Sequence, residues 1–227
     1  MSISDVVTSF TQIAQSQWRL PRYSNTDKVV SSDILPIVIA HRGNLNGPNK
    51  EMENKPEYVM ANLDSMMTTS GGQWELKRCV LAEIDVRYIV KECGNEGCRD
   101  GESEDEESQN GASEGGCKDG EWWLGHDTPD YKVTLDFLRH PLLICHAKNF
   151  EAFVRLLKEG IHCFWHQDDD YTLTSNGWLW AYPGKDSSMG IAVMPETAHG
   201  TNPKDWSSVT RLTRGVCTDY VESFFTK

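Results

Sequence analysis

Several short apolar runs in this chain end in charged or imidazole side chains. The run Ile37–Ala40, for example, is followed immediately by His41 and Arg42. An unbroken apolar run of this length is typical of a strand that is covered on both faces. Similar runs lie at 79–90, 142–149, 161–170, 189–196 and 216–220. Polar side chains are therefore expected to collect where buried strands end.

Segments with helical periodicity alternate with these runs, and helices are predicted at 55–69, 150–160 and 205–215. Alternating strands and helices are typical of parallel β-α-β units, and no glycine-rich dinucleotide-binding loop follows the first strand. The sequence therefore predicts an α/β protein with a small TIM-type (β/α)8 barrel, in which functional side chains lie at the carboxyl ends of the strands. Polar residues at the predicted strand ends include His41, Glu83, Asp85, His126, His146, Lys148, Glu196 and Asp219.

The composition argues against two classes of partner. The net charge of −12 is opposite to what a nucleic-acid-binding surface requires. No segment approaches the roughly 20 apolar residues that a transmembrane helix needs. The first residues lack the basic start and continuous apolar core of a signal peptide, and the seven cysteines are not spaced as a disulfide framework. A cytoplasmic location is therefore expected.

The acidic residues are concentrated in one segment. Residues 91–121 contain eleven acidic and three basic side chains and almost no large apolar ones. Residues 91–120 are therefore predicted to be a disordered insertion in a β-hairpin of the barrel. Residues 1–35 are predicted to be a helical N-terminal extension, and 36–227 the barrel domain. Three cysteines of the insertion could form a structural zinc site, but they lack a fourth ligand and Cys-x-x-Cys spacing.

Glu83 and Asp85 are the first candidates for a metal site. They are separated by one residue, so on a strand both side chains lie on the same face. Two carboxylates on an apolar strand repel each other unless they share a proton or bind a hard cation. Alternatively, Asp85 forms a salt bridge with Arg87, which lies on the same face. The spacing alone leaves these alternatives open.

A series of motifs resembles the glycerophosphodiester phosphodiesterase family. In chain order these are His-Arg-Gly-Asn (41–44), Glu-Asn (53–54), Glu-x-Asp (83–85), Gly-His-Asp (125–127), Cys-His-Ala-Lys-Asn (145–149) and the closing strand at 215–220. The resemblance covers about residues 36–220, with the acidic segment as an interruption. It implies a TIM-type barrel, a divalent cation, and hydrolysis of a small-molecule glycerophosphodiester to glycerol 3-phosphate and an alcohol.

The resemblance also implies roles for individual residues. By position, His41 and His126 are expected to be the catalytic general acid and base, because imidazole titrates near neutral pH. Arg42 and Lys148 are expected to bind the phosphoryl group. Glu83 and Asp85 are expected to bind the metal, with Mg²⁺ or Ca²⁺ as the expected cofactor and Mn²⁺ as an alternative. Glu53 is expected at the edge of the metal site, either in the metal shell or as an orienting group.

His146 departs from the family pattern, which usually places a third carboxylate two residues before the lysine. Histidine is a softer ligand without charge, so Mg²⁺ or Ca²⁺ could bind more weakly and a transition metal be better tolerated. Alternatively, His146 does not bind the metal. In the segment 164–184, Trp180 is expected either to contact the alcohol part of the substrate or to pack in a hairpin over the barrel.

Two other functions stay open at this point. One is a non-catalytic barrel that binds a phosphorylated ligand or a protein partner, for which the substitution at His146 is the support. The other is an intramolecular phosphodiester transferase of the sphingomyelinase D kind, which uses a similar pair of histidines and a Glu-x-Asp motif. A cyclic phosphate product would distinguish the transferase from the hydrolase.

Overall fold

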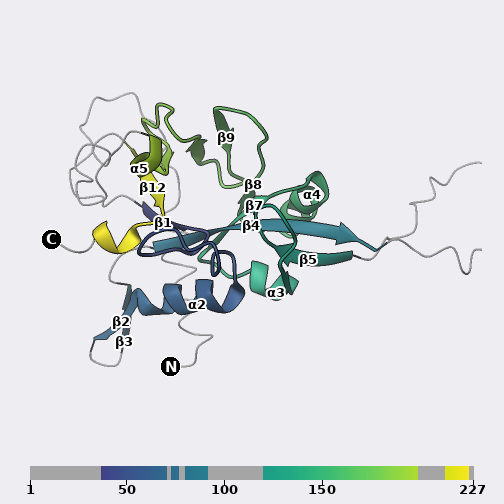
Figure 1. The fold of residues 1–227 in the computed structure, drawn as a ribbon, viewed down its shortest axis with the longest axis horizontal. Helices are drawn as coiled ribbons and strands as arrows, with labels where there is room; N and C mark the ends of the chain where they lie inside the picture. The colour runs from purple at the N-terminus through teal and green to yellow at the C-terminus, as the bar shows by residue number, and fades with distance from the viewer. Residues whose placement is uncertain (1–36, 71–72, 77–79, 92–119, 199–212, 225–227) are drawn as a thin grey trace, which may run out of the picture.

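A ten-stranded mixed sheet forms the centre of the protein (Figure 1). The computed structural model describes residues 37–70, 73–76, 80–91, 120–198 and 213–224. Strands β8, β7, β4, β1, β12, β11 and β10 lie side by side in this order and are parallel. Their bounds are Cys163–Phe164 (β8), Leu143–Ala147 (β7), Val80–Val90 (β4), Ile37–His41 (β1), Gly215–Thr218 (β12), Ile191–Val193 (β11) and Leu179–Ala181 (β10).

Antiparallel strands extend this parallel core at two places. Strand β5 (Gly120–Leu124) returns along the second half of β4 and pairs in turn with β6 (Tyr131–Val133). Strand β9 (Tyr171–Leu173) pairs with β10. A separate two-stranded hairpin consists of β2 (Met67–Ser70) and β3 (Gln73–Leu76).

Short helices connect several of the parallel strands. They are α2 (Pro56–Ser65), α3 (Leu135–Leu138), α4 (Phe150–Lys158) and α5 (Pro195–Ala198), and a 3₁₀ helix, η1 (Val221–Phe224), follows the last strand. Helix α4 begins where the Asn149 side chain accepts a hydrogen bond from the Ala152 amide, which is a common N-terminal cap. Helix α3 begins in the same way at Thr134.

The predicted (β/α)8 barrel is wrong, because the sheet is a half-barrel that does not alternate strand and helix throughout. Between β8 and β10 the described chain forms loops and the hairpin strand β9 instead of a helix. The local sequence explains this, since Asp168–Asp170 and Ser175–Gly177 are turn-forming stretches too closely spaced for a helix. Most of the helix predicted at 205–215 lies outside the described residues.

The half-barrel has a seam between β8 and β10, where the described residues form no strand pairing. Hydrogen bonds join the two sides there: the Ser175 amide donates to the Cys163 carbonyl (2.7 Å), and the Cys163 amide donates to Ser175 Oγ (3.0 Å). Ser175 Oγ also donates to the Ile161 carbonyl (3.3 Å), and Thr172 Oγ1 donates to the Trp165 carbonyl (3.0 Å). Phe164 and Trp180 face each other across the same seam, with ring centroids 4.5 Å apart. We call these contacts the Ser175 seam.

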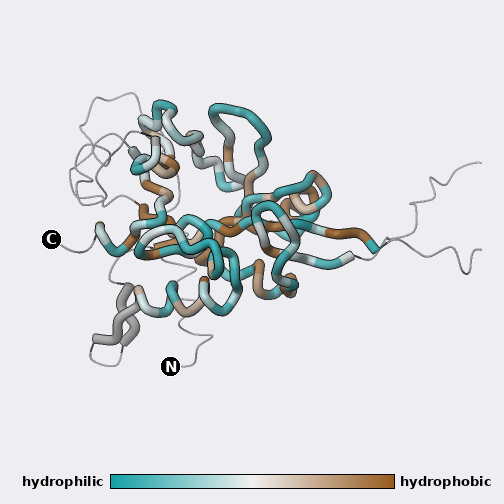
Figure 2. The backbone as a smooth tube through the Cα atoms, in the orientation of Figure 1, coloured by the Kyte–Doolittle hydropathy of each residue, from teal (hydrophilic) through white to brown (hydrophobic). Residues whose placement is uncertain are grey.

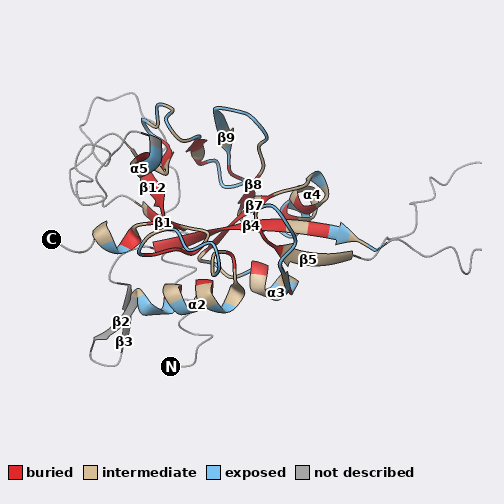
Figure 3. Cartoon of the chain, viewed as in Figure 1, coloured by how far each residue is buried: buried red, intermediate tan, exposed pale blue. Residues whose placement is uncertain are grey.

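Two hydrophobic clusters lie on opposite faces of the parallel strands. One cluster contains Val38 and Ala40 of β1 and packs against Val59 of α2 and Leu156 of α4. The other contains no residue of these helices and consists of Ile39, Leu81, Ile144, Phe164, Trp178, Trp180, Ile191 and Cys217. The alternation of side chains along a strand produces this division. Apolar and buried residues follow the central strands, whereas the loops are polar and more exposed (Figures 2 and 3).

Several predicted elements are confirmed. The runs at 37–40, 79–90 and 142–149 form β1, β4 and β7, and the segment after the acidic insertion returns as β5 alongside β4. The helix predicted at 55–69 ends earlier, at Ser65, because β2 begins at Met67. The predicted N-terminal extension and residues 92–119 of the insertion lie outside the described residues. No helix in the part of the chain described here is long and apolar enough to cross a lipid bilayer.

The register of the β4–β5 hairpin gives a direct test of the acidic insertion. Val90 lies opposite Gly120, so a two-residue Asn-Gly turn in place of residues 91–119 would close the hairpin with a favoured turn type. We expect a folded protein whose free energy of unfolding is unchanged or raised by up to about 2 kcal/mol, since each halving of a loop saves about 0.6 kcal/mol. Urea unfolding measures this. An unfolded variant would show that the insertion is a structural subdomain.

Candidate active site and cation site

The carboxyl ends of the parallel strands supply the polar side chains of one cavity. On each strand the polar residue follows a core residue by two positions, and therefore lies on the same face. His41 follows Ile39 and Glu83 follows Leu81 in this way. The corresponding pairs on β7 and after β8 are Ile144 and His146, and Phe164 and His166. At the end of β12, Asp219 follows Cys217 in the same way and contacts His41, although it does not itself line the cavity. The apolar cluster thus forms the floor beneath these groups.

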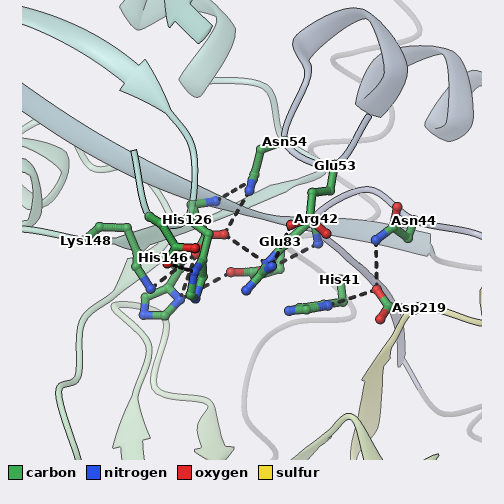
Figure 4. Close-up of polar contacts among 12 residues, drawn as sticks. His41, Arg42, Asn44, Glu53, Asn54, Glu83, His126, His146, Lys148 and Asp219 are labelled. Atoms are coloured by element: carbon green, nitrogen blue, oxygen red, sulfur yellow. Dashed lines mark hydrogen bonds and ion pairs between the residues drawn. The ribbon is translucent and has the colours of Figure 1, made fainter. Parts of the chain in front are cut away.

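The cavity has a volume of about 290 Å³. Every residue that the sequence analysis assigned to the site lines it, with the exception of Glu53. The structure therefore brings together side chains from β1, β4, β7, β10 and the loop after β5. Figure 4 shows the polar contacts among these side chains.

Glu83, Asp85 and His146 form a compact donor group in this cavity. One oxygen of each carboxylate and a ring nitrogen of His146 all lie within 4.8 Å of one another. His146 Nδ1 is 3.4 Å from both Glu83 Oε1 and Asp85 Oδ1. Both carboxylates are buried. The strand register explains the arrangement, since Asp85 of β4 lies directly beside His146 of β7.

The remaining oxygen of each carboxylate accepts a hydrogen bond from the backbone or an amide. Glu83 Oε2 accepts from the Arg42 amide (3.2 Å), and Asp85 Oδ2 accepts from Asn54 Nδ2 (2.9 Å). Asn54 Oδ1 in turn accepts from the Asp85 amide (2.8 Å). These bonds orient the other two oxygens, Glu83 Oε1 and Asp85 Oδ1, toward His146.

The three donor atoms are suitably placed for a divalent cation. Ligands about 2.1–2.4 Å from a common centre, at tetrahedral to octahedral angles, lie about 3.0–3.9 Å apart. The 3.4 Å separations from His146 Nδ1 fall in this range, and they also suit the ion pairs that a protonated His146 makes with the two carboxylates. The residues present therefore fit the cation that the family resemblance implies.

Arg42 ties several parts of the site together. Its Nη1 donates to Glu53 Oε1 (2.8 Å), and its Nε lies 3.1 Å from Asp85 Oδ2 in an ion pair without hydrogen-bond geometry. The Arg42 carbonyl accepts from the Asn54 amide (3.0 Å). Arg42 has a left-handed backbone conformation (φ 51°), which is uncommon for a residue with a side chain. Glu53 thus orients the guanidinium and is not among the three cation donors.

Lys148 adds a second positive charge on the other side of Asp85. Its Nζ is 3.5 Å from Asp85 Oδ1. Burial alone would raise the pKa of Asp85, but hydrogen bonding to His146 and the charges of His146, Arg42 and Lys148 outweigh it and hold that pKa well below its usual range. Asp85 is therefore ionised at neutral pH.

His41 is paired with a buried aspartate. Its Nδ1 is 2.9 Å from Asp219 Oδ1, which also accepts a hydrogen bond from Asn44 Nδ2 (2.9 Å). Burial lowers the pKa of His41, but the hydrogen bond with Asp219 and the charges of Glu83 and Asp219 outweigh it and raise that pKa above its ordinary value. Asp219 fixes the tautomer with the proton on Nδ1, so Nε2 can accept a proton.

His126 lies in the loop after β5 and is more accessible than His41. Its Nδ1 is 2.6 Å from Asp127 Oδ1, and its side chain is 40% exposed. The His126 carbonyl accepts a hydrogen bond from Arg87 (2.6 Å). Arg87 therefore bonds to this loop rather than to Asp85. The alternative Asp85–Arg87 salt bridge is thus not among the contacts that the structure gives these two residues.

The aromatic wall of the cavity includes the predicted Trp180. Its ring is buried and packs on Phe164. Tyr182, which lines the same cavity, is exposed by 48%. Trp180 lies in the β9–β10 hairpin, belongs to the apolar floor and lines the cavity, whereas its contact with an alcohol group stays a prediction.

Comparison of the chain with protein-family models, with curated proteins and with solved structures finds no match. The function is therefore argued from the geometry of the site and from the motif resemblance.

Three supporting residues had no role assigned from sequence. Asp219, Asn44 and Asn54 are buried and orient His41 and Asp85. A signal was present, since each belongs to one of the motifs that carry the resemblance. Their partners lie far away in the chain, however, and Asp219 is 178 positions from His41. Only the fold shows which side chain each one contacts.

Proposed function

We propose that this chain is a divalent-cation-dependent phosphodiesterase that hydrolyses glycerophosphodiesters to glycerol 3-phosphate and an alcohol. The observation that supports the proposal is the content of one cavity. It holds a cation donor group of two carboxylates and an imidazole, two further cationic side chains, and two histidines that each contact an aspartate. The motif order that resembles glycerophosphodiester phosphodiesterases supplies the substrate class.

The cationic groups suit a phosphodiester anion. Arg42 presents a planar guanidinium that can bind two phosphoryl oxygens, and Lys148 provides a point charge. Glu83, Asp85 and His146 would hold a divalent cation, which would withdraw charge from a phosphoryl oxygen as the transition state develops. Glu53 keeps Arg42 in place through its 2.8 Å hydrogen bond.

The two histidines divide the proton transfers. His41 Nε2 accepts the proton of the attacking hydroxyl, while Asp219 stabilises the imidazolium that forms. His126, in its protonated form, donates a proton to the departing alcohol oxygen. The resemblance implies that the glycerol hydroxyl of the substrate attacks first, which gives a cyclic phosphate that water then opens.

A diester panel tests the proposal. Purified protein is incubated with glycerophosphocholine, glycerophosphoethanolamine and glycerophosphoglycerol, each with Mg²⁺, Ca²⁺ or Mn²⁺, and glycerol 3-phosphate is measured with and without chelator. We expect release that the chelator abolishes. An accumulated cyclic phosphate would indicate a transferase of the sphingomyelinase D kind. Tight ligand binding without turnover under any of these conditions would establish a non-catalytic binding protein.

A cytoplasmic location is part of the same proposal. The cysteines in the described residues, Cys145, Cys163 and Cys217, are free thiols and are buried. Cys145 and Cys163 are register partners on neighbouring parallel strands. Free thiols in such proximity suit a reducing compartment.

A further inference from the structure

The donor group of the proposed cation site contains an imidazole in a place where a third carboxylate would suit Mg²⁺ or Ca²⁺. These hard cations take oxygen ligands in proteins. Imidazole nitrogen is instead a preferred ligand of first-row transition cations. Because His146 Nδ1 is equally distant from Glu83 Oε1 and Asp85 Oδ1, at 3.4 Å, it is an equal member of the group and not a neighbour of a two-carboxylate site.

The His146 ring is held in this position. Its plane is within 16° of the rings of Phe164 and His166, at centroid distances of 4.5 and 4.8 Å. Its side chain is only 13% exposed, and its backbone is fixed by the β4–β7 ladder. The His146 ring therefore cannot move away from the two carboxylates without losing its stacking contacts. A cation bound by all three donor atoms would therefore have nitrogen as one of its ligands.

The charges around the site do not separate one divalent cation from another. Arg42 Nε lies 3.1 Å and Lys148 Nζ 3.5 Å from Asp85, and Arg42 also pairs with Glu53. Because these charges act equally on all divalent cations, the preference depends on the ligand atoms. A nitrogen ligand favours first-row transition cations, among which Mn²⁺ binds more weakly than Co²⁺.

We infer that His146 makes this site selective for a first-row transition cation, Mn²⁺, Co²⁺ or Zn²⁺, over Mg²⁺ and Ca²⁺. The inference rests on the cation site of the proposed function and names the class of cation. It concerns binding and is independent of which diester, if any, is hydrolysed.

Direct binding to the full-length protein, without substrate, tests the inference. Calorimetric titration with Mn²⁺ and with Mg²⁺ gives the two dissociation constants, and we expect Mn²⁺ to bind at least about 10-fold more tightly. Titration with Co²⁺ adds a visible absorption spectrum that reports nitrogen and oxygen ligands. Because thiols elsewhere in the chain can also bind Co²⁺ and Zn²⁺, the informative signal is the difference between wild type and His146→Gln.

Two substitutions at one position separate ligand identity from folding. We expect His146→Gln to lose the Co²⁺ difference spectrum and most of the preference for Mn²⁺. We expect His146→Glu, which supplies a third carboxylate, to shift the ranking toward Mg²⁺ and Ca²⁺. His126→Ala is the matched control, because it removes an imidazole of the same cavity that is not in the donor group, and it should keep the wild-type ranking. Circular dichroism checks that each variant is folded.

The outcomes separate this inference from the proposed function. Equal affinity for Mn²⁺ and Mg²⁺, or an unchanged ranking in folded His146→Glu, would overturn the inference even if diesters are hydrolysed. The expected ranking in a protein that hydrolyses no diester would support the inference and contradict the proposed function.

Discussion

Replacing His41 by glutamine lowers the turnover of a glycerophosphodiester by about 10²- to 10⁴-fold, the range typical of a general acid or base. Glutamine can still donate a hydrogen bond to Asp219, but it cannot accept the proton of the attacking hydroxyl. Steady-state kinetics with the best substrate of the diester panel measures the loss. His140→Gln is the control, because His140 does not line the cavity and its replacement should leave turnover within a few-fold. Equal turnover in the two variants would remove His41 from the mechanism.

Asp219→Asn adds a second readout to the same prediction. The pKa of His41 is raised by its hydrogen bond with Asp219 and by nearby carboxylates, against the effect of burial. His41 must be neutral to accept a proton, so activity falls as the pH drops through its pKa. Without the charge of Asp219 that pKa is lower, and the acid limb of the kcat/KM profile should move to lower pH. A purely structural role for Asp219 would lower activity without moving this limb.

Replacing Trp178 by alanine lowers the free energy of unfolding by about 3–5 kcal/mol, the usual cost of deleting a large core aromatic. Trp178 is 1% exposed and belongs to the apolar floor. Its ring also contacts the His162 ring edge-on at 4.9 Å and lies 5.4 Å from the Arg214 guanidinium. Among the described residues, this cluster contains no helix side chain, and a cavity left by the ring adds to the cost. Urea unfolding measures the loss.

Leu173→Ala is the matched control for the Trp178 prediction. Leu173 lies on β9 and is 63% exposed, so its truncation should change the free energy of unfolding by no more than about 0.5 kcal/mol. A loss as large as that expected for Trp178→Ala can unfold a domain of ordinary stability. Trp178→Phe therefore provides a milder substitution that should retain the fold with an intermediate loss. Equal urea midpoints for Trp178→Ala and Leu173→Ala would contradict the assigned role of the tryptophan.

The sequence was sufficient to predict the contents of the site but not the closure of the sheet. The two-residue period of a strand places Glu83 and Asp85 on one face, and the structure places both in the cavity. The hairpin expected as one alternative in the segment 164–184 is present as β9–β10. Its place in the sheet could not be predicted, since three-residue strands carry too little periodicity and pair through contacts set by the rest of the sheet. The (β/α)8 prediction failed because it extended a regular alternation through residues 161–196.

The supporting contacts could not be predicted from the sequence for a different reason. Whether Asp85 pairs with Arg87 or with Arg42 depends on the turn at Arg42, whose left-handed backbone brings its guanidinium back toward β4. That conformation is held by long-range bonds to Glu83 and Asn54. Arginine has no special preference for the left-handed conformation, so the sequence around Arg42 gives no local sign of it.

The Ser175 seam makes one wall of the cavity more compliant than the other. The wall formed by β1, β4 and β7 is a continuous hydrogen-bonded ladder, so it resists deformation. Across the seam there is no such ladder, and the bonds come from the Ser175 backbone and hydroxyl and from the Thr172 hydroxyl. Packing of Phe164 against Trp180 also holds this side together. The charged wall therefore has its geometry fixed by backbone pairing, whereas the aromatic wall depends on side-chain contacts that a substitution at Ser175 or Thr172 can weaken.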